Sequence, residues 1–444
     1  MSRLTNKKIE KGFLLKYASG LKDQKGVAVI LVALMIVMLL GFVALAIDIG
    51  YYMVTRNELQ NITDGAALAA CRELGAIYQK LSPEDQKNFV CNSACSGNII
   101  AKAVNVGENN RAGGHQPIVI NSEDVIIGTW DGSALTPTLA QPDAVRVITR
   151  RDGNANSPIT TFFAGLLGID SIDVWMDATA ALTGQSTTEP GELELPIGIS
   201  SYFFQDGNAC NNFIVFNPTN DPDSCAGWNS FDISPPNDNL LRNILNGDPT
   251  SPATIAGDTE FNFIGGNLSN PTFDALLSLF KRKGYDIKAN GEPVEYTDLL
   301  DDNGSPVLDD DGSTIQIPKP GSLSPDDGDV VPIAEDGLPL FEDDGSPRLD
   351  EKGIPLEQAE YPDGTLRNQH RWETTVAVYG WDTCDNPNTS ITIVGYTKIA
   401  MTNVQTAPEK RIEGEIMCDL FSEFDTRGGG GEFGVKGTIP GLVE

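Results

Sequence analysis

Residues 27–47 read VAVILVALMIVMLLGFVALAI, a run of 21 residues without a charged residue or a proline. As an α-helix this run is about 30 Å long, which matches the hydrocarbon core of a bilayer. A buried helix of a water-soluble protein normally shows a polar stripe, and this run shows none. The sequence therefore predicts a single transmembrane helix over residues 26–48.

Charge is distributed unevenly around this segment. The first 26 residues hold seven Lys/Arg and two Asp/Glu, for a net charge of +5, whereas the whole chain of 444 residues carries −31. Positively charged flanks stay on the cytoplasmic side of a membrane. We therefore expect a cytoplasmic basic head over residues 1–25 and the bulk of the chain outside the cytoplasm. The acidic balance argues against nucleic acid as a partner, because binding phosphates needs positive charge.

A cleaved signal peptide is the alternative interpretation of the apolar run. Its apolar core would be about 7–15 residues long and would be followed by a site with small residues at two positions. Ala44 and Ala46 provide only a weak site of this kind, and it lies inside the run. The length of the run favours a retained anchor.

The helix is predicted to continue beyond the membrane. Residues 49–76 contain no proline, and their apolar residues recur near the helical period. Gly50 and Gly65 weaken a helix without ending it. The apolar stripe of this amphipathic continuation needs a partner, which is either the outer domain of the same chain or another copy of the protein.

The order of motifs along this helix resembles a known family. The chain has KGVA at 25–28, DIGYY at 48–52, RNELQN at 56–61 and DGAALAA at 64–70. This order is similar to the N-terminal segment of the Tad-type (Flp) pilus-assembly proteins, the TadE/TadG-like group. A weaker resemblance continues to about Leu182 and is similar to the companion outer domain of those proteins.

The resemblance implies a membrane-anchored structural or assembly component of a Tad (Flp) type IV pilus or related secretion system. It implies a single-pass protein of the bacterial inner membrane, with no enzymatic activity and no cofactor. Its partners would be other pilus-assembly proteins, or further copies bound through the 49–76 helix. Type IV pilins carry a glutamate five residues after their processing site. If this chain were cut after Gly26, the residue at that position would be Leu31. We therefore expect the anchor to be retained.

The remaining chain predicts an α+β protein. Residues 49–183 form a helix plus an α+β outer domain, in which β-rich runs at 117–120, 124–130, 144–150 and 172–182 and a short helix at 158–167 suggest a helix packed on an antiparallel sheet. A linker follows at 184–192. Residues 193–427 predict a β-rich C-terminal domain with one amphipathic helix at 271–283, and residues 428–444 predict a flexible tail.

An acidic tract at 286–365 interrupts the C-terminal domain. It holds 22 Asp/Glu and four Lys/Arg, and the segment DNGSPVLD at 302–309 recurs as DDGSPRLD at 343–350. Asn-Gly and Asp-Gly pairs are typical hairpin turns, so the tract is predicted to be an inserted arm of small hairpins, with disorder as the alternative. An anchored extracellular adhesin or binding module using this arm is the alternative function. No complete EF-hand loop is present, so the acidic tract is expected to be a solvated surface, with weak calcium binding as the alternative.

Seven cysteines lie in the part predicted to be outside the cytoplasm, where disulfides are stable. No C-x-x-C motif is present, which argues against redox, haem and zinc-ribbon sites. We expect Cys210 to pair with Cys225 within one loop, and Cys384 to pair with Cys418 between strands. Cys71 would then pair with Cys91 or Cys95, and one thiol would be left over or would pair between molecules.

No catalytic constellation is apparent in the sequence. The chain has two histidines, His115 after a Gly-Gly pair and His370 within NQHR, and neither lies beside an obvious partner. We therefore predict no catalytic, cofactor-binding or metal-binding residues.

Overall fold

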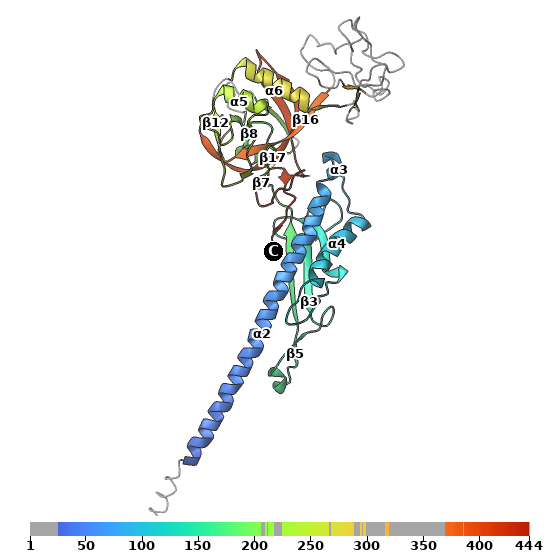
Figure 1. The fold of residues 1–444 in the computed structure, drawn as a ribbon, viewed down its shortest axis with the longest axis vertical. Helices are drawn as coiled ribbons and strands as arrows, with labels where there is room; N and C mark the ends of the chain where they lie inside the picture. Colours follow the sequence, from blue (N-terminus) through green and yellow to red (C-terminus); the bar gives the residue numbers. More distant parts are fainter. Residues whose placement is uncertain are drawn as a thin grey trace, which may run out of the picture.

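One helix dominates the computed structural model, which describes residues 25–205, 209–210, 212–216, 224–265, 268–287, 294, 296–298, 316–318, 369–384 and 386–443. Helix α2 (Lys25–Tyr78) has 54 residues and is therefore about 80 Å long. Figure 1 shows it crossing one side of a small domain and extending far beyond it. The prediction that the apolar run continues into a second, outer part of the same helix is confirmed.

The other elements are short. The helices are α3 (Pro83–Lys87), α4 (Ser93–Glu108), α5 (Asp238–Leu245) and α6 (Asn270–Lys283), with 3-10 turns η1 (Ser122–Asp124), η2 (Ala164–Leu167) and η3 (Ser201–Phe204). The strands are β1 (Val125–Trp130), β2 (Leu135–Pro137), β3 (Ala144–Arg151), β4 (Ile159–Thr160), β5 (Ser171–Ile172), β6 (Val174–Ala181), β7 (Thr187–Thr188), β8 (Ile197–Ser200), β9 (Phe213–Phe216), β10 (Ala226–Asn229), β11 (Thr254–Ile255), β12 (Glu260–Ile264), β13 (Tyr285–Ile287), β14 (Tyr296–Asp298), β15 (Gln316–Pro318), β16 (Gln369–Tyr379), β17 (Ser390–Gln405), β18 (Arg411–Met417), β19 (Leu420–Phe421), β20 (Val435–Lys436) and β21 (Gly441–Leu442).

The first domain is an antiparallel sheet covered by helices. Its strand order is β2-β1-β3-β6-β21. Strand β3 alternates between covered and partly exposed residues, as a strand with one buried face should. The outer half of α2 and helix α4 share a buried cluster with that face, which includes Ile127, Val145 and Val147. The predicted arrangement of a helix on an antiparallel sheet is confirmed.

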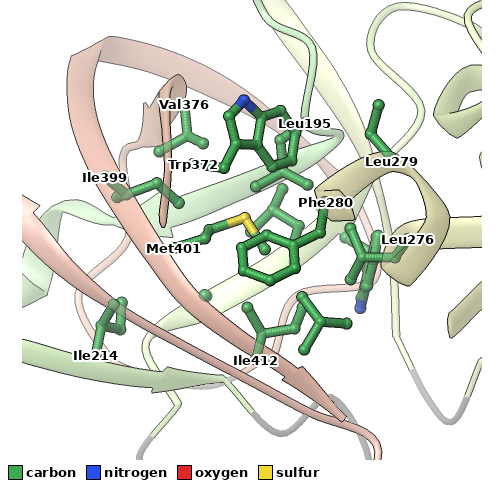
Figure 2. Close-up of a cluster of buried hydrophobic side chains, with 14 of the residues drawn as sticks. Leu195, Ile214, Leu276, Leu279, Phe280, Trp372, Val376, Ile399, Met401 and Ile412 are labelled. Atoms are coloured by element: carbon green, nitrogen blue, oxygen red, sulfur yellow. The ribbon is translucent and has the colours of Figure 1, made fainter. Parts of the chain in front are cut away.

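The second domain is rich in β-structure and centres on a ring of strands. The order β16-β8-β10-β12-β17 closes through a further pairing of β16 with β17, and β18 and β9 extend the sheet beyond β17. Strands β8 and β16 run parallel, and the other pairs are antiparallel. Figure 2 shows the core, in which Leu276 and Phe280 of α6 lie against Trp372 of β16 and Met401 of β17. The amphipathic helix expected at 271–283 is therefore a core helix.

The end of the chain is an ordered connection between the two domains, which corrects the predicted flexible tail at 428–444. Strand β21 adds to the sheet of the first domain beside β6. Lys436 Nζ lies 2.6 Å from a carboxylate oxygen of the buried Asp143. The predicted linker at 184–192 is also ordered, because β7 pairs with β11 and Gln185 N donates to Val435 O. Composition could not reveal this, because the partners lie hundreds of residues away.

Two local predictions also need correction, and two helices were not predicted. The segment expected to be a helix at 158–167 is strand β4, which pairs with β5, followed by the 3-10 turn η2, which ends at Gly168. The strand expected at 117–120 is an irregular segment. Helices α4 and α5 were missed, although asparagine caps the start of each, Asn92 for α4 and Asn237 for α5.

The predicted acidic arm at 286–365 lies largely outside the described residues. The start of the tract and the strand that follows it lie side by side, because Ile287 of β13 pairs with Gln369 of β16. His370 fastens this base, with Nδ1 2.8 Å from Asp286 Oδ1 and Nε2 2.9 Å from the Phe280 carbonyl oxygen. The tract is predicted to be inserted in the C-terminal domain, and the strands on either side of it, β13 and β16, are paired neighbours in the sheet of that domain.

Candidate functional site

Helix α2 has two halves with opposite surroundings. From Val29 to Val54 its large apolar side chains are exposed, and the window that meets the hydropathy criterion for a membrane span has a mean hydropathy of 3.2 with none of it buried in the protein. From Leu59 to Tyr78 its apolar residues are buried or partly buried. The stripe predicted to need a partner is therefore covered by the chain's own outer domain, which was the first of the two expected alternatives.

Small side chains allow that covering. Ala66, Ala67 and Ala70 are fully buried in a cluster with residues of α4 and of the sheet. Gly75 lies against the C-terminal segment so closely that a Cβ atom would collide with the Thr438 carbonyl oxygen. The DGAALAA motif at 64–70 thus acts as a close-packing surface on which the domain is seated.

Polar residues of the two preceding motifs, DIGYY and RNELQN, bind a loop of the outer domain near the middle of α2. Tyr51 donates from its hydroxyl to the Gly113 carbonyl oxygen at 2.6 Å, and Glu58 accepts from the Gly113 amide at 2.7 Å. Gly113 can make both contacts because it has φ +54°, and because a side chain there would collide with Thr55 and Arg151. The loop with the Gly-Gly pair before His115 therefore binds α2 through the backbone of Gly113.

A second polar contact lies deeper, between the helix and the sheet. The hydroxyls of Thr63 and Thr149 are 2.5 Å apart and both residues are fully buried. Gln60 donates to Asp64 Oδ1 at 2.7 Å and to the Asp177 carbonyl oxygen at 3.3 Å. Buried hydroxyls without partners are costly, so these pairs fix which face of α2 meets the sheet.

Asp48 marks the boundary between the two halves and holds a loop of the outer domain. Its carboxylate accepts three backbone N–H bonds, from Phe162 at 2.7 Å, Phe163 at 3.0 Å and Ala164 at 2.7 Å. Sequence reasoning used Asp48 only as the end of the apolar run and as part of the DIGYY motif at 48–52. It missed this role because the partner segment lies more than a hundred residues further on, although the uncharged run FFAGLLGI at 162–169 was a signal of an unusual loop.

The disulfides of the second domain connect remote segments, which corrects the predicted pairs. Cys210 is bonded to Cys418, and Cys225 to Cys384. Strand β9 pairs with β18 in a register that sets Phe213 opposite Glu415, and continuing that register brings Cys210 opposite Cys418. The predicted pairing chose the shortest loops, and sheet topology overrides that preference.

The remaining cysteines lie in the first domain. Cys91 is bonded to Cys95 at the start of α4, so the predicted bond from Cys71 to either of them is wrong. Cys71 is a free thiol on the covered face of α2, and it is fully buried. Burial raises the pKa of the Cys71 thiol, with the charge of Asp143 adding to the effect, so the thiol is unreactive.

Within the described residues, no group of three or more His, Cys, Asp or Glu side chains is arranged to hold a metal ion. His115 lies in the loop that grips α2, and its backbone pairs with Ala112. His370 has a structural role at the base of the arm, as described above. The arrangement that the structure builds is therefore an anchoring site, made by α2 and the loops that hold it.

Comparison with known proteins supports this interpretation of the helix. Residues 26–73 match the Tad family model, described as "Putative Flp pilus-assembly TadE/G-like". The comparisons with curated proteins and with solved structures each returned no match. The matched segment spans both the exposed half of α2 and the motif residues that hold the outer domain. Over residues 26–73 the chain is therefore similar to the TadE/G-like proteins of Flp pilus assembly.

Proposed function

We propose that this protein is a structural component of a Tad (Flp) pilus or related secretion system, anchored in the bacterial inner membrane by the inner half of α2. The N-terminal basic head is cytoplasmic and both folded domains are extracytoplasmic. The observation that carries the proposal is the division of one continuous helix into a bare apolar half and a half built into a folded domain.

A cleaved signal peptide does not fit this division well. The apolar run passes without a break into the motif residues that form the core of the outer domain, and Asp48 at the junction is itself bonded to that domain. Cleavage after Ala46 would remove the bare half of α2 and leave only the covered half in the folded domain. Three disulfides fit an oxidising compartment outside the cytoplasm.

The covered half of α2 has little apolar surface left for other copies. Self-association through this helix would use its bare half within the membrane, together with Ile49, Met53 and Val54, which are exposed just outside it. Contacts between such helices depend on close packing rather than on the hydrophobic effect. We therefore propose that other membrane-spanning pilus subunits, or further copies, pack against this part of the helix.

The test is deletion of the gene in its natural host, with surface pili counted by electron microscopy and with complementation by the wild-type chain. Loss of pili that the wild type restores supports the proposal. Normal pilus numbers in the deletion strain, together with loss of attachment to surfaces, would overturn it in favour of the anchored adhesin. A variant with residues 288–368 replaced by a two-residue turn separates the two, because an adhesin using the arm would lose attachment while keeping its membrane level and disulfides.

A further inference from the structure

An apolar loop lies at the level where α2 leaves its bare half. The hairpin of β4 and β5 carries η2 at its tip, and Phe162, Leu166 and Leu167 there are 61%, 87% and 80% exposed. We call residues 162–169 the apolar tip; it contains no charged residue. Monomeric proteins rarely present adjacent leucines this bare, and exposed apolar clusters mark contact surfaces.

The tip is a built structure with a defined position. Gly168 ends η2 with φ +85°, Thr161 donates from its hydroxyl to the Ile169 carbonyl oxygen at 2.6 Å, and β4 pairs with β5 below it. Asp48 of α2 accepts the three backbone N–H groups that open the turn. The tip is therefore tied to the residue that directly follows the apolar run.

The level of the tip can be compared with the extent of bare helix. Exposed apolar side chains run on α2 from Val29 to Val54, a stretch about 39 Å long, close to the thickness of a bilayer with its headgroups. Asp48 lies within the outer part of that stretch. In Figure 1 the β5 hairpin hangs from the sheet on the side of the bare half of α2.

Aromatic side chains surround this level. The ring of Tyr51 on α2 packs edge-on against Phe162, with centroids 5.1 Å apart. Trp175 at the start of β6 is 54% exposed. Tyrosine and tryptophan are enriched at the boundary between membrane and water, where their rings contact acyl chains and their polar atoms form hydrogen bonds with headgroups or water.

From these observations we propose that the apolar tip inserts into the outer leaflet of the membrane, at the boundary between headgroups and acyl chains. This rests on the proposed anchoring by α2. The tip forms a second membrane contact beside the helix, and Asp48 couples the two. A single membrane helix can rotate and tilt. A helix together with the inserted apolar tip would fix the orientation of the outer domains relative to the membrane.

The experiment uses the full-length protein in vesicles of phosphatidylcholine and phosphatidylglycerol at three to one, a roughly bacterial surface charge. Three single-cysteine variants, Leu166→Cys, Met38→Cys and Ala134→Cys, are labelled with an environment-sensitive fluorophore. The buried Cys71 and the bonded cysteines do not react. Ala134 is the matched control, because its exposed turn lies at the far end of the sheet, beyond the pairing of Gly128 with Ala144.

We expect the Leu166 label to emit at shorter wavelength and to lose most of its fluorescence to lipids carrying a quencher just below the headgroup. The Ala134 label should keep its fluorescence. Quenching at Met38 without quenching at Leu166 would overturn the membrane contact of the tip while leaving the anchor intact. Absence of quenching at Met38 would overturn the anchor itself. A blue-shifted Leu166 label that lipid does not quench, but that dilution of protein in the vesicles reverses, would show that a second copy covers the tip.

The positioning role of Asp48 is tested by a separate variant. Asp48→Ala removes the acceptor for three backbone N–H groups and frees the tip from α2. We expect quenching of the Leu166 label to fall while quenching of the Met38 label stays the same. Unchanged quenching at Leu166 in this variant would show that Asp48 does not set the depth of the tip.

Discussion

The two halves of α2 differ in apolar content and are opposite in what they contact. The half before Asp48 carries long side chains such as leucine, isoleucine and methionine, and all of them are exposed. The half after Asp48 carries alanine, glycine and short polar residues at its contact face, and these are buried. Bulky apolar residues suit lipid chains, whereas small residues allow another helix and a sheet to approach closely.

The largest expected effect comes from charging the bare half. In Leu34→Arg/Met38→Arg, each arginine should cost about 2.5–3.5 kcal/mol at the centre of the membrane, so the protein should fail to integrate. The measurement is extraction of membranes with alkaline carbonate. The matched control is Asn57→Arg/Asn61→Arg, with the same spacing on the exposed side of the covered half, which should stay integrated. Equal extraction of both variants would contradict the claim that only the bare half of α2 lies in the membrane.

A methyl group added to the covered half should destabilise the outer domain. In Gly75→Ala the new Cβ meets the Thr438 carbonyl oxygen, so α2 and the C-terminal segment must separate. Overpacking of this kind costs about 1–3 kcal/mol, or a fall of about 3–10 °C in the melting temperature of the detergent-solubilised chain. Gly97→Ala in α4 is the control, because a Cβ there has open space and alanine favours the helix. A melting temperature in Gly75→Ala no lower than in the control would contradict the close packing.

The buried hydroxyl pair offers a smaller and more specific effect. Thr63→Val removes a hydrogen bond across the contact between helix and sheet and leaves Thr149 short of a partner, at a cost of about 1–2 kcal/mol. Thr63→Val/Thr149→Val should be less destabilised than the sum of the two single variants, because neither group is left unpaired. Thermal unfolding of all four forms gives the coupling. Additive effects would mean that the two hydroxyls do not act as a pair.

The smallest expected effect depends on pH and lies at the outer end of the covered half. Asp425 accepts from Gln79 at 2.8 Å and from Arg72 at 2.5 Å, and these partners hold its pKa below the usual value. A lowered pKa adds stability above the ordinary carboxyl range, and that stability is lost as the pH falls through the folded-state value. Both side chains of the ion pair are partly exposed, so the contribution is a few tenths of a kcal/mol.

Asp425→Asn should therefore lower the melting temperature slightly at pH 7 and by less at pH 3, where part of the carboxylate is protonated. The comparison with the wild type at both pH values is the measurement. An equal difference at the two pH values would show that the loss comes from packing and not from the charge of Asp425.

Local patterns predicted α2, both of its halves and its family, because apolar length and short motifs are properties of neighbouring residues. The same reasoning failed where distant segments meet. The bond between Cys210 and Cys418 follows from the register of β9 with β18, and the ordered tail follows from β21 joining β6. The role of Asp48 was hidden for the same reason, since its partners Phe162 to Ala164 belong to another part of the chain.

The most direct test of the account is a scan of single cysteines along α2 in intact cells, with a thiol reagent that cannot cross the membrane. Asn57→Cys and Asn61→Cys should react from outside, Val29→Cys to Ile47→Cys should be protected in protein recovered from the membrane fraction, and Lys25→Cys should react only after the cells are opened. Reaction from outside along residues 29–47, or recovery of membrane protein that lacks these residues, would contradict the claim that one helix both spans the membrane and holds the outer domain.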